Sequence, residues 1–175
     1  MAFSMTGIFL IVCIVVFFGL VVFIGAPYVP SQKKYAKRVF DYVGLTSDDT
    51  LVDIGSGDGI VLRVAASYGA RAVGYEINPL LVLISKLLSL HQPKVHVRLQ
   101  NSWTATFPKS TTIVYAFSVK RDEKKLRTLM QREANRLGRP LKLLCLGSPF
   151  KQLVAADAFE AYYLYIFQPL QLKKA

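Results

Sequence analysis

The feature that most constrains this chain is a glycine-rich turn that follows a short apolar strand. Residues 51–59 read Leu-Val-Asp-Ile-Gly-Ser-Gly-Asp-Gly, and Glu76 stands 21 residues after Gly55. Glycine accepts a positive φ and lets backbone N–H groups approach a ligand closely. A carboxylate at the end of the next strand lies where nucleotide-binding α/β folds hold ribose hydroxyls. Together the two features predict a cofactor pocket.

The spacing of the glycines separates two kinds of cofactor. The NAD fingerprint is G-x-G-x-x-G, whereas this loop is G-x-G-x-G. Asp53 stands two residues before the first glycine, where its carboxylate would repel a pyrophosphate but not a cation. With Gly-Tyr-Glu-Ile-Asn-Pro at 74–79, the loop resembles motif I and the acidic motif of class I S-adenosylmethionine-dependent methyltransferases. Their cofactor carries an ammonium and a sulfonium. A structural strand–turn–helix with chance glycines is the alternative.

The N-terminal segment predicts a membrane anchor. No charged side chain precedes Lys33, and Gly7–Ala26 is an unbroken apolar run of 20 residues. As a helix this run spans about 30 Å, the thickness of the hydrocarbon core. A cleaved signal peptide would have a positively charged start and a shorter apolar core. We therefore expect a retained transmembrane helix, with residues 1–30 as anchor and linker and 31–175 as the methyltransferase domain.

The charge distribution predicts how the anchor is oriented in the membrane, and it indicates a lipid partner. The formal net charge is +11, and basic residues begin directly after the apolar run, at Lys33, Lys34, Lys37 and Arg38. The positive-inside rule then places the C-terminal domain in the cytoplasm, or in the matrix if the membrane is mitochondrial. Part of the charge fits contact with anionic lipid headgroups, and part fits a plain solvated surface. A nucleic-acid partner is not expected, because no recognised binding motif accompanies the charge.

Alternating helical and strand patterns predict an α/β fold with a mostly parallel sheet. The expected strands are 50–54, 71–75, 95–99, 111–117, 141–146 and a last one at 162–167, antiparallel and on an edge. The helix from Pro79 to about Leu90 is apolar almost all round, which predicts that it is buried. The helix around 126–137 should be apolar on one face and charged on the other.

The segment from Gly25 to Ser31, with its two prolines, extends the resemblance to a narrower family. The chain is similar to small membrane-anchored protein-lysine methyltransferases related to the mitochondrial enzymes that modify the ATP synthase c-subunit and the adenine nucleotide translocase. This resemblance implies a Rossmann-like class I methyltransferase sheet with flanking helices, preceded by one transmembrane helix, and S-adenosylmethionine as cofactor. It also implies that the stretch 27–31 passes beside the cofactor.

The resemblance assigns roles around the cofactor. Asp53 would hold the turn or reach the ammonium, and Glu76 would accept both ribose hydroxyls. Ile77 and Trp103 would sandwich the adenine, with Asn101 where related enzymes often carry an aspartate. The expected cofactor-binding residues are Tyr28, Pro30, Ser31, Asp53, Gly55, Ser56, Gly57, Glu76, Ile77, Asn101, Ser102 and Trp103.

Methyl transfer to a lysine is an in-line displacement that needs positioning and a neutral amine. Desolvation in an apolar slot helps a lysine to lose its proton. The candidates for this slot are Tyr28, Phe117 and Ser118, together with Phe150. Ordinary core packing is the alternative for the two phenylalanines. No Asn/Asp-Pro-Pro-Tyr motif follows the fourth strand, which disfavours methylation of a planar base nitrogen.

The sequence therefore predicts a membrane-anchored S-adenosylmethionine-dependent methyltransferase that acts on lysine side chains. The expected substrate is a membrane-associated protein. A methyltransferase for a lipid or quinone-like molecule and a weakly active cofactor-binding scaffold are the alternatives. The lipid bilayer is an expected partner. No metal is expected, because His91 and His96 have no acidic or cysteine partner at ligand spacing.

Overall fold

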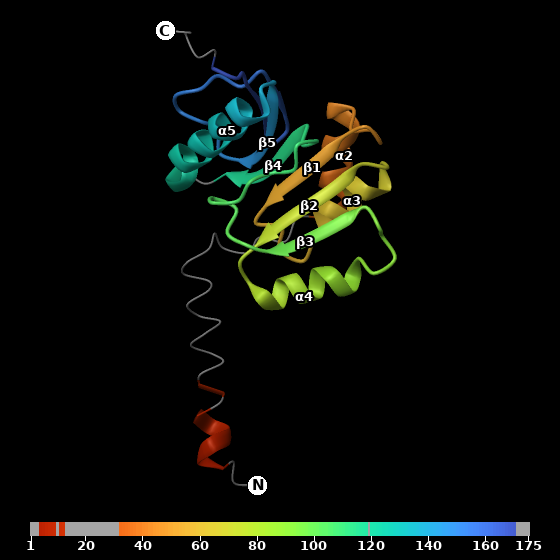
Figure 1. Cartoon of the computed structure of the whole chain (residues 1–175), viewed down its shortest axis with the longest axis vertical. Coiled ribbons are helices and arrows are strands. Elements are labelled where there is room, and N and C mark those ends of the chain that lie inside the picture. The colour runs from red at the N-terminus through yellow and green to blue at the C-terminus, as the bar shows by residue number, and fades with distance from the viewer. Residues whose placement is uncertain (1–3, 10, 13–31, 119, 171–175) are drawn as a thin grey trace. The chain divides into compact units, whose positions relative to one another are not determined.

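Seven strands form one mixed sheet in the order β3-β2-β1-β4-β5-β7-β6 (Figure 1). The first five strands in the chain are parallel, whereas β7 runs antiparallel to β5 and β6 antiparallel to β7. The predicted α/β fold with a mostly parallel sheet is confirmed. The strands are β1 (Thr50–Ile54), β2 (Arg71–Glu76), β3 (Val95–Leu99), β4 (Ile113–Ser118), β5 (Leu141–Gly147), β6 (Asp157–Phe159) and β7 (Tyr162–Phe167).

The structure is a computed structural model and describes residues 4–9, 11–12, 32–118 and 120–170. The chain divides into two units, Met1–Pro30 and Ser31–Ala175, and each is considered by itself. In the second unit the helices are α2 (Lys33–Val43), α3 (Ile60–Ser67), α4 (Pro79–Leu88), the 3₁₀ helix η1 (Lys120–Asp122) and α5 (Glu123–Leu137).

The first unit is described only at residues 4–9 and 11–12, of which 5–9 and 11–12 are helical. The predicted membrane-spanning run 7–26 therefore lies largely outside the described residues and stays a prediction. Within the described ranges, no helix combines the length and the apolar character needed to cross a bilayer.

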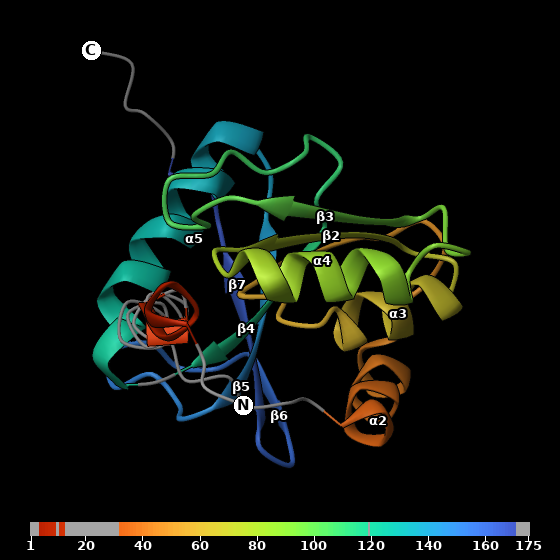
Figure 2. The ribbon, with the colours of Figure 1, turned by 90° about the horizontal axis from the view of Figure 1, so that it is seen from below.

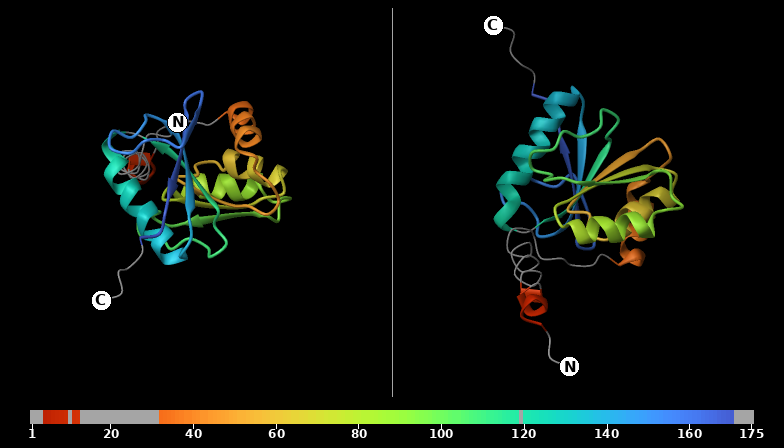
Figure 3. Two further views of the ribbon diagram at one scale, coloured as in Figure 1. Left: turned by 90° about the horizontal axis from the view of Figure 1, so that it is seen from above. Right: turned by 60° about the horizontal axis from the view of Figure 1, so that its bottom comes forward.

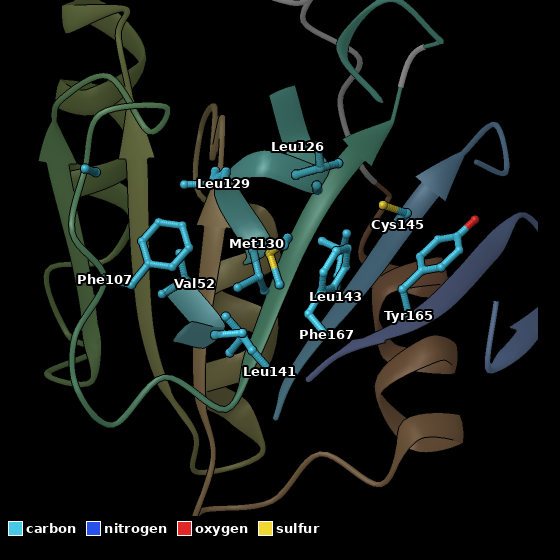
Figure 4. Packing of buried hydrophobic residues seen from close by; sticks show 14 of the residues in the cluster. Val52, Phe107, Leu126, Leu129, Met130, Leu141, Leu143, Cys145, Tyr165 and Phe167 are labelled. Carbon is cyan, nitrogen blue, oxygen red and sulfur yellow. The ribbon is translucent and has the colours of Figure 1, made fainter. Parts of the chain in front are cut away.

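Each face of the sheet has its own apolar core. Phe40 of α2 and Leu62 of α3 are buried on one face, against inward-facing residues of β1 and β2. On the other face Leu129 and Met130 of α5 pack with Phe107 and strand residues (Figure 4). Figure 2 shows α5 on one side of the sheet and α2 with α3 on the other. Because β1 and β4 are covered on both faces, their carboxyl ends are held firmly.

One charged residue of α5 belongs to the core. Glu133 is only 1% exposed, because it lies seven residues after Leu126 and so on the apolar face of this helix. Its Oε2 accepts the backbone N–H of Phe107 at 3.1 Å and a guanidinium N–H of Arg136 at 2.6 Å. Its Oε1 accepts from Arg132 at 3.1 Å. The buried carboxylate thus ties the loop between β3 and β4 to the helix.

The prediction that the helix after Pro79 is buried is wrong. In α4 only Val82 and Ser85 are buried, while Leu83 and Leu87 are 54% and 56% exposed. The reason is the position of α4 beside β3, the last strand at that end of the sheet (Figure 3). Among the described residues, nothing covers the outer side of the helix. Periodicity indicates an apolar surface but not what lies against it.

The C-terminal end of the sheet also differs from expectation. β7 is antiparallel, as predicted, but it is not an edge strand. The short strand β6 pairs with it, Phe159 opposite Tyr162, and takes the edge position. A strand of three residues carries no readable alternation, so its pairing was not predicted.

Candidate functional site

The glycine-rich loop lies at the carboxyl end of β1, where the strand order of the sheet reverses between β1 and β4. Ligands of open α/β sheets bind at such a switch point. Gly55, Gly57 and Gly59 have φ angles of 89°, 54° and 79°, in the left-handed region that favours glycine. The backbone N–H groups of Gly55 and Ser56 donate to the carbonyl of Tyr75 at 2.8 and 3.1 Å. The loop is therefore fastened to the end of β2.

Two close approaches fix the surroundings of this loop. A Cβ on Gly74 would lie 2.4 Å from Ser56 Oγ and 2.5 Å from a methyl carbon of Leu62. A Cβ on Gly59 would lie 2.0 Å from Oγ of Ser85, which comes from α4. Gly74 thus lets the loop lie on β2, and Gly59 lets α4 approach the start of α3. The packing role of Gly74 was not predicted; a glycine inside a strand pattern is the signal for it.

The Ser56 hydroxyl lies against Gly74 and is buried, with no hydrogen-bond partner among the described residues. Its side chain therefore faces the sheet. A contact of Ser56 with a ligand would come from its backbone, as for the neighbouring glycines.

Glu76 ends β2 and is only 8% exposed. Its Oε2 accepts the backbone N–H of Gly57 at 2.9 Å, and its Oε1 accepts those of Ile77 and Asn78 at 2.7 and 2.8 Å. A carboxylate offers about four acceptor positions, so the side chain is held in place by three donors and still has capacity on Oε2. The structure brings Gly57, Glu76 and Ile77 together, as the sequence indicated.

Asp53 lies in β1, 3% exposed, between Gly74 of β2 and Tyr115 of β4. Burial, together with the negative charges of Glu76 and Asp58, raises the pKa of Asp53 to about 8. Asp58 has an ion pair with Arg63 at 3.4 Å. In the part of the chain that the structure describes, neither Asp53 nor Glu76 has a basic partner.

This electrostatic arrangement fits a cationic ligand. Two buried or nearly buried carboxyl groups, Asp53 and Glu76, stand at a loop whose backbone can approach a ligand closely. An opposite charge beside such a group favours its ionised form. S-adenosylmethionine brings an ammonium, a sulfonium and ribose hydroxyls, so the residues present fit this cofactor.

The loop after β3 contributes the segment expected to reach the adenine. Asn101 Oδ1 accepts the backbone N–H of Trp103 at 3.0 Å, which closes a tight turn. Arg132 of α5 donates to the Trp103 carbonyl at 3.0 Å. Trp103 is half-buried against the core on the α5 face, and Ser102 and Ile77 are also half-buried. These residues follow neighbouring strands, but their contact with adenine stays a prediction.

The candidates for the substrate slot divide into two groups. Phe117 is 37% exposed near the carboxyl end of β4, and Ser118 ends that strand. Phe150 is buried instead: its ring stacks on Tyr165 with centroids 4.4 Å apart, and its N–H donates to the Tyr165 hydroxyl. Ordinary core packing thus accounts for Phe150. Tyr28, Pro30 and Ser31 lie outside the described residues, so their predicted contacts remain predictions.

An open groove of about 900 Å³ lies beside α5 and the loop after β5. Among the described residues that line it, Glu123 is the only acidic one, and it accepts the N–H of Lys151 at 3.0 Å. The groove therefore gathers positive charge next to the carboxyl end of β4. Its basic lining residues are Lys120, Arg121, Lys124, Arg127 and Lys151.

Comparison with known proteins gives relatives in sequence and in structure, although no family model matches the chain. The chain is 35% identical over 112 residues to the ATP synthase C-subunit lysine N-methyltransferase of Xenopus laevis, a match covering 60% of this chain and 49% of that protein. It is 36% identical over 92 residues to the human protein of the same name, covering 50% of this chain and 39% of the other.

Among solved structures, an RNA methyltransferase from Salinibacter ruber in complex with S-adenosyl-L-homocysteine aligns with a TM-score of 0.69. The sequence identity is 24%, and the alignment covers 84% of this chain and 98% of that one. This likeness shows that the domain has a Rossmann-like methyltransferase fold. The sequence matches confirm the predicted resemblance to the ATP synthase lysine methyltransferases, of which the matched region spans less than half the length.

Proposed function

We propose that this chain is an S-adenosylmethionine-dependent methyltransferase that methylates lysine side chains of a protein and works at a membrane. The observation that carries the proposal is the arrangement of Gly57, Glu76 and the buried Asp53 at the switch point of the sheet. The similarity to proteins named as lysine N-methyltransferases supports the choice of lysine over other acceptors.

Each residue of the pocket has a distinct task. The left-handed glycines hold the loop open so that backbone groups meet the amino-acid part of the cofactor. Glu76 is fixed by three backbone donors, which keeps its carboxylate oriented toward ribose hydroxyls without reorganisation. Asp53 supplies negative charge beside the cationic part of the cofactor. When bound, S-adenosylmethionine would supply an electrophilic methyl group, which forms a bond to the amine nitrogen as its bond to sulfur breaks and the thioether leaves.

The acceptor must arrive as a neutral amine. Phe117, partly exposed near the carboxyl end of β4, provides an apolar surface there that disfavours the charged form of a lysine. The proton leaves to solvent before the displacement, so the described residues need only position the two reactants. Tyr28 and Ser118 are the further proposed contacts of this slot.

The proposed location is a membrane, with the catalytic domain on the cytoplasmic or matrix side. The apolar run 7–26 and the basic residues that follow it support this placement. Tethering in the same bilayer raises the effective concentration of a membrane-embedded substrate. A small membrane protein that exposes a lysine near the headgroups is thus the proposed partner.

Transfer of a radiolabelled methyl group into native membranes tests the proposal. Detergent-solubilised protein is compared with Glu76→Ala and with Asp48→Ala, a matched change of an exposed acidic residue outside the pocket. We expect a protease-sensitive labelled band that is lost with Glu76→Ala and kept with Asp48→Ala. Thermal unfolding of both variants confirms that they fold. Label that extracts with lipid would overturn the lysine assignment in favour of a lipid or quinone-like acceptor.

RNA is a second candidate acceptor, favoured by one observation. The cationic groove beside α5 is of a kind that binds polyanions, and the aligned structure is named as an RNA methyltransferase. Adding total RNA to the same assay separates the two candidates. Label that is sensitive to ribonuclease and resistant to protease would replace the protein substrate with RNA.

A further inference from the structure

The outward face of α4 is apolar, which is the reverse of an ordinary surface helix. Leu80, Leu83, Leu87 and Leu90 recur at steps of three and four residues and so lie along one side of the helix and the turn that follows it. They are 44%, 54%, 56% and 70% exposed. The opposite side, with the buried Ser85, faces the rest of the domain. We call these four residues the leucine stripe.

The strand at the edge of the sheet carries a further exposed leucine. β3, beside which α4 packs, ends in Leu99, which is 59% exposed. Single exposed leucines are common on soluble proteins, but a contiguous apolar row marks a surface that meets a partner. We therefore expect a partner to cover the leucine stripe.

Charge distinguishes the possible occupants. No acidic residue occurs between Glu76 and Asp122, a stretch that includes all of α4 and β3. Lys86 lies exposed on the flank of the leucine stripe, and Lys94 and Arg98 are exposed on the segment that follows. A helix with an apolar face, basic flanks and no acid is typical of helices that lie in the interface of an anionic membrane. A second copy of this chain, with its net charge of +11, would bring like charges together.

We propose that the leucine stripe of α4 lies in the headgroup region of a bilayer that contains anionic lipid. The stripe inserts at the boundary between headgroups and acyl chains, while Lys86 meets lipid phosphates. This contact is separate from the apolar N-terminal run, because it is formed by the folded domain itself.

The contact has a consequence for the proposed active site. α4 begins at Pro79, three residues after Glu76, so a helix lying on the membrane holds the carboxyl edge of β2 at the headgroups. This consequence rests on the proposed function, and it places the pocket where a lysine of a membrane-embedded substrate emerges. The lipid contact itself is measured without methyl transfer, so the two can fail separately.

The test places an environment-sensitive fluorophore on α4 of the full chain. Leu83→Cys is labelled in a Cys13→Ser background, in which the remaining Cys145 is buried. The protein is reconstituted in vesicles of phosphatidylcholine, alone or mixed with phosphatidylglycerol. The matched control is Leu170→Cys, a leucine that is 65% exposed against 54% for Leu83 and whose N–H donates to Asn135 of α5. Figure 1 shows α5 away from α4. We expect a blue shift and quenching by nitroxide lipids at 83 only, stronger with the anionic lipid.

Three other results would overturn the proposal. An unshifted probe at 83 in both kinds of vesicle would show that α4 stays in water. A shift that rises with protein density, with disulfide cross-linking between 83 and 83, would assign the stripe to a second copy. If the probe at 83 is blue-shifted in vesicles and in detergent but is not quenched by nitroxide lipids, another part of the chain covers the leucine stripe. Lys86→Glu adds a quantitative check: it should weaken the quenching several-fold in anionic vesicles and leave it unchanged in phosphatidylcholine.

Discussion

α4 and α5 follow β2 and β4 in the same way, yet their compositions and burial are opposed. α5 is rich in charged residues and buries one of them, Glu133, together with a full apolar face. α4 is almost wholly apolar and leaves most of its leucines in solvent. The difference is one of position: α5 covers the middle of the sheet, whereas α4 lies beside its last strand (Figure 2). Where an element lies in the sheet, and not its apolar content, decides how much of it is buried.

The largest expected effect is a difference between equal substitutions in the two helices. Leu129→Ala in α5 removes a side chain that is 2% exposed, which should cost about 2–5 kcal/mol of unfolding free energy. Leu83→Ala in α4 removes one that is already 54% exposed, with an expected change within about 0.5 kcal/mol. Denaturant unfolding in mild detergent measures both. Equal losses would mean that the outer face of α4 is covered.

The buried carboxylate of α5 gives the next largest effect. Glu133→Ala leaves the Phe107 N–H without an acceptor and separates two arginines from their partner, which should cost about 3 kcal/mol. Glu133→Gln keeps an acceptor for that N–H and should cost less. Thermal unfolding measures the order of the two variants. If both variants cost the same, the ion pairs and not the hydrogen bond to Phe107 hold the loop.

The central strands were predictable because their signals are local. β1 and β3 have the bounds expected from the sequence, 50–54 and 95–99. β1 is buried along nearly its whole length, as expected for a strand in the middle of a parallel sheet. The pocket could be predicted for the same reason, because Asp53, the glycines and Glu76 lie at the ends of two adjacent strands.

The features that the sequence left open depend on contacts between distant segments. Gly74 is needed because Ser56 and Leu62 approach it. A glycine inside a strand signals a close approach but does not show which residues make it. Phe117 lies within β4 and Phe150 follows β5, and only the fold brings Tyr165 against Phe150. The exposure of α4 likewise follows from the strand order. Local patterns thus predicted the elements and the pocket, while the packing partners came from topology.

A third prediction concerns the close approach of α4 to the start of α3 at Gly59 and Ser85. Gly59→Ala places a Cβ in contact with Ser85 Oγ and requires alanine at a φ of 79°, which should cost about 2 kcal/mol. Ser85→Ala alone should be near neutral, because that hydroxyl is buried without a partner among the described residues. The double variant should recover the steric part of the loss and keep the backbone strain. Additive losses in this double-mutant cycle would contradict the close approach of the helices.

A pH dependence of stability links the pocket to the cofactor. The pKa of Asp53 is raised to about 8 by burial, with Glu76 and Asp58 adding to the rise. The folded, unliganded protein therefore binds a proton that the unfolded chain releases near pH 4. Stability from this group is full below pH 4 and falls as the pH rises toward 8. Asp53→Asn should remove this fall, and thermal unfolding of the unliganded protein between pH 5 and 8 measures it.

A cation bound beside Asp53 favours its ionised form, so binding of S-adenosylmethionine should release this proton. Its affinity should then rise with pH by up to about tenfold per unit between about pH 5.5 and 7, below the range in which an α-amino group titrates. Calorimetric titration measures the slope. 5′-Deoxy-5′-methylthioadenosine, which lacks both cationic groups, should show none, and neither should Asp53→Asn with the full cofactor. A flat profile for the wild-type protein would place the cofactor's positive charge away from Asp53 and leave Glu76 as the only acidic contact of the pocket.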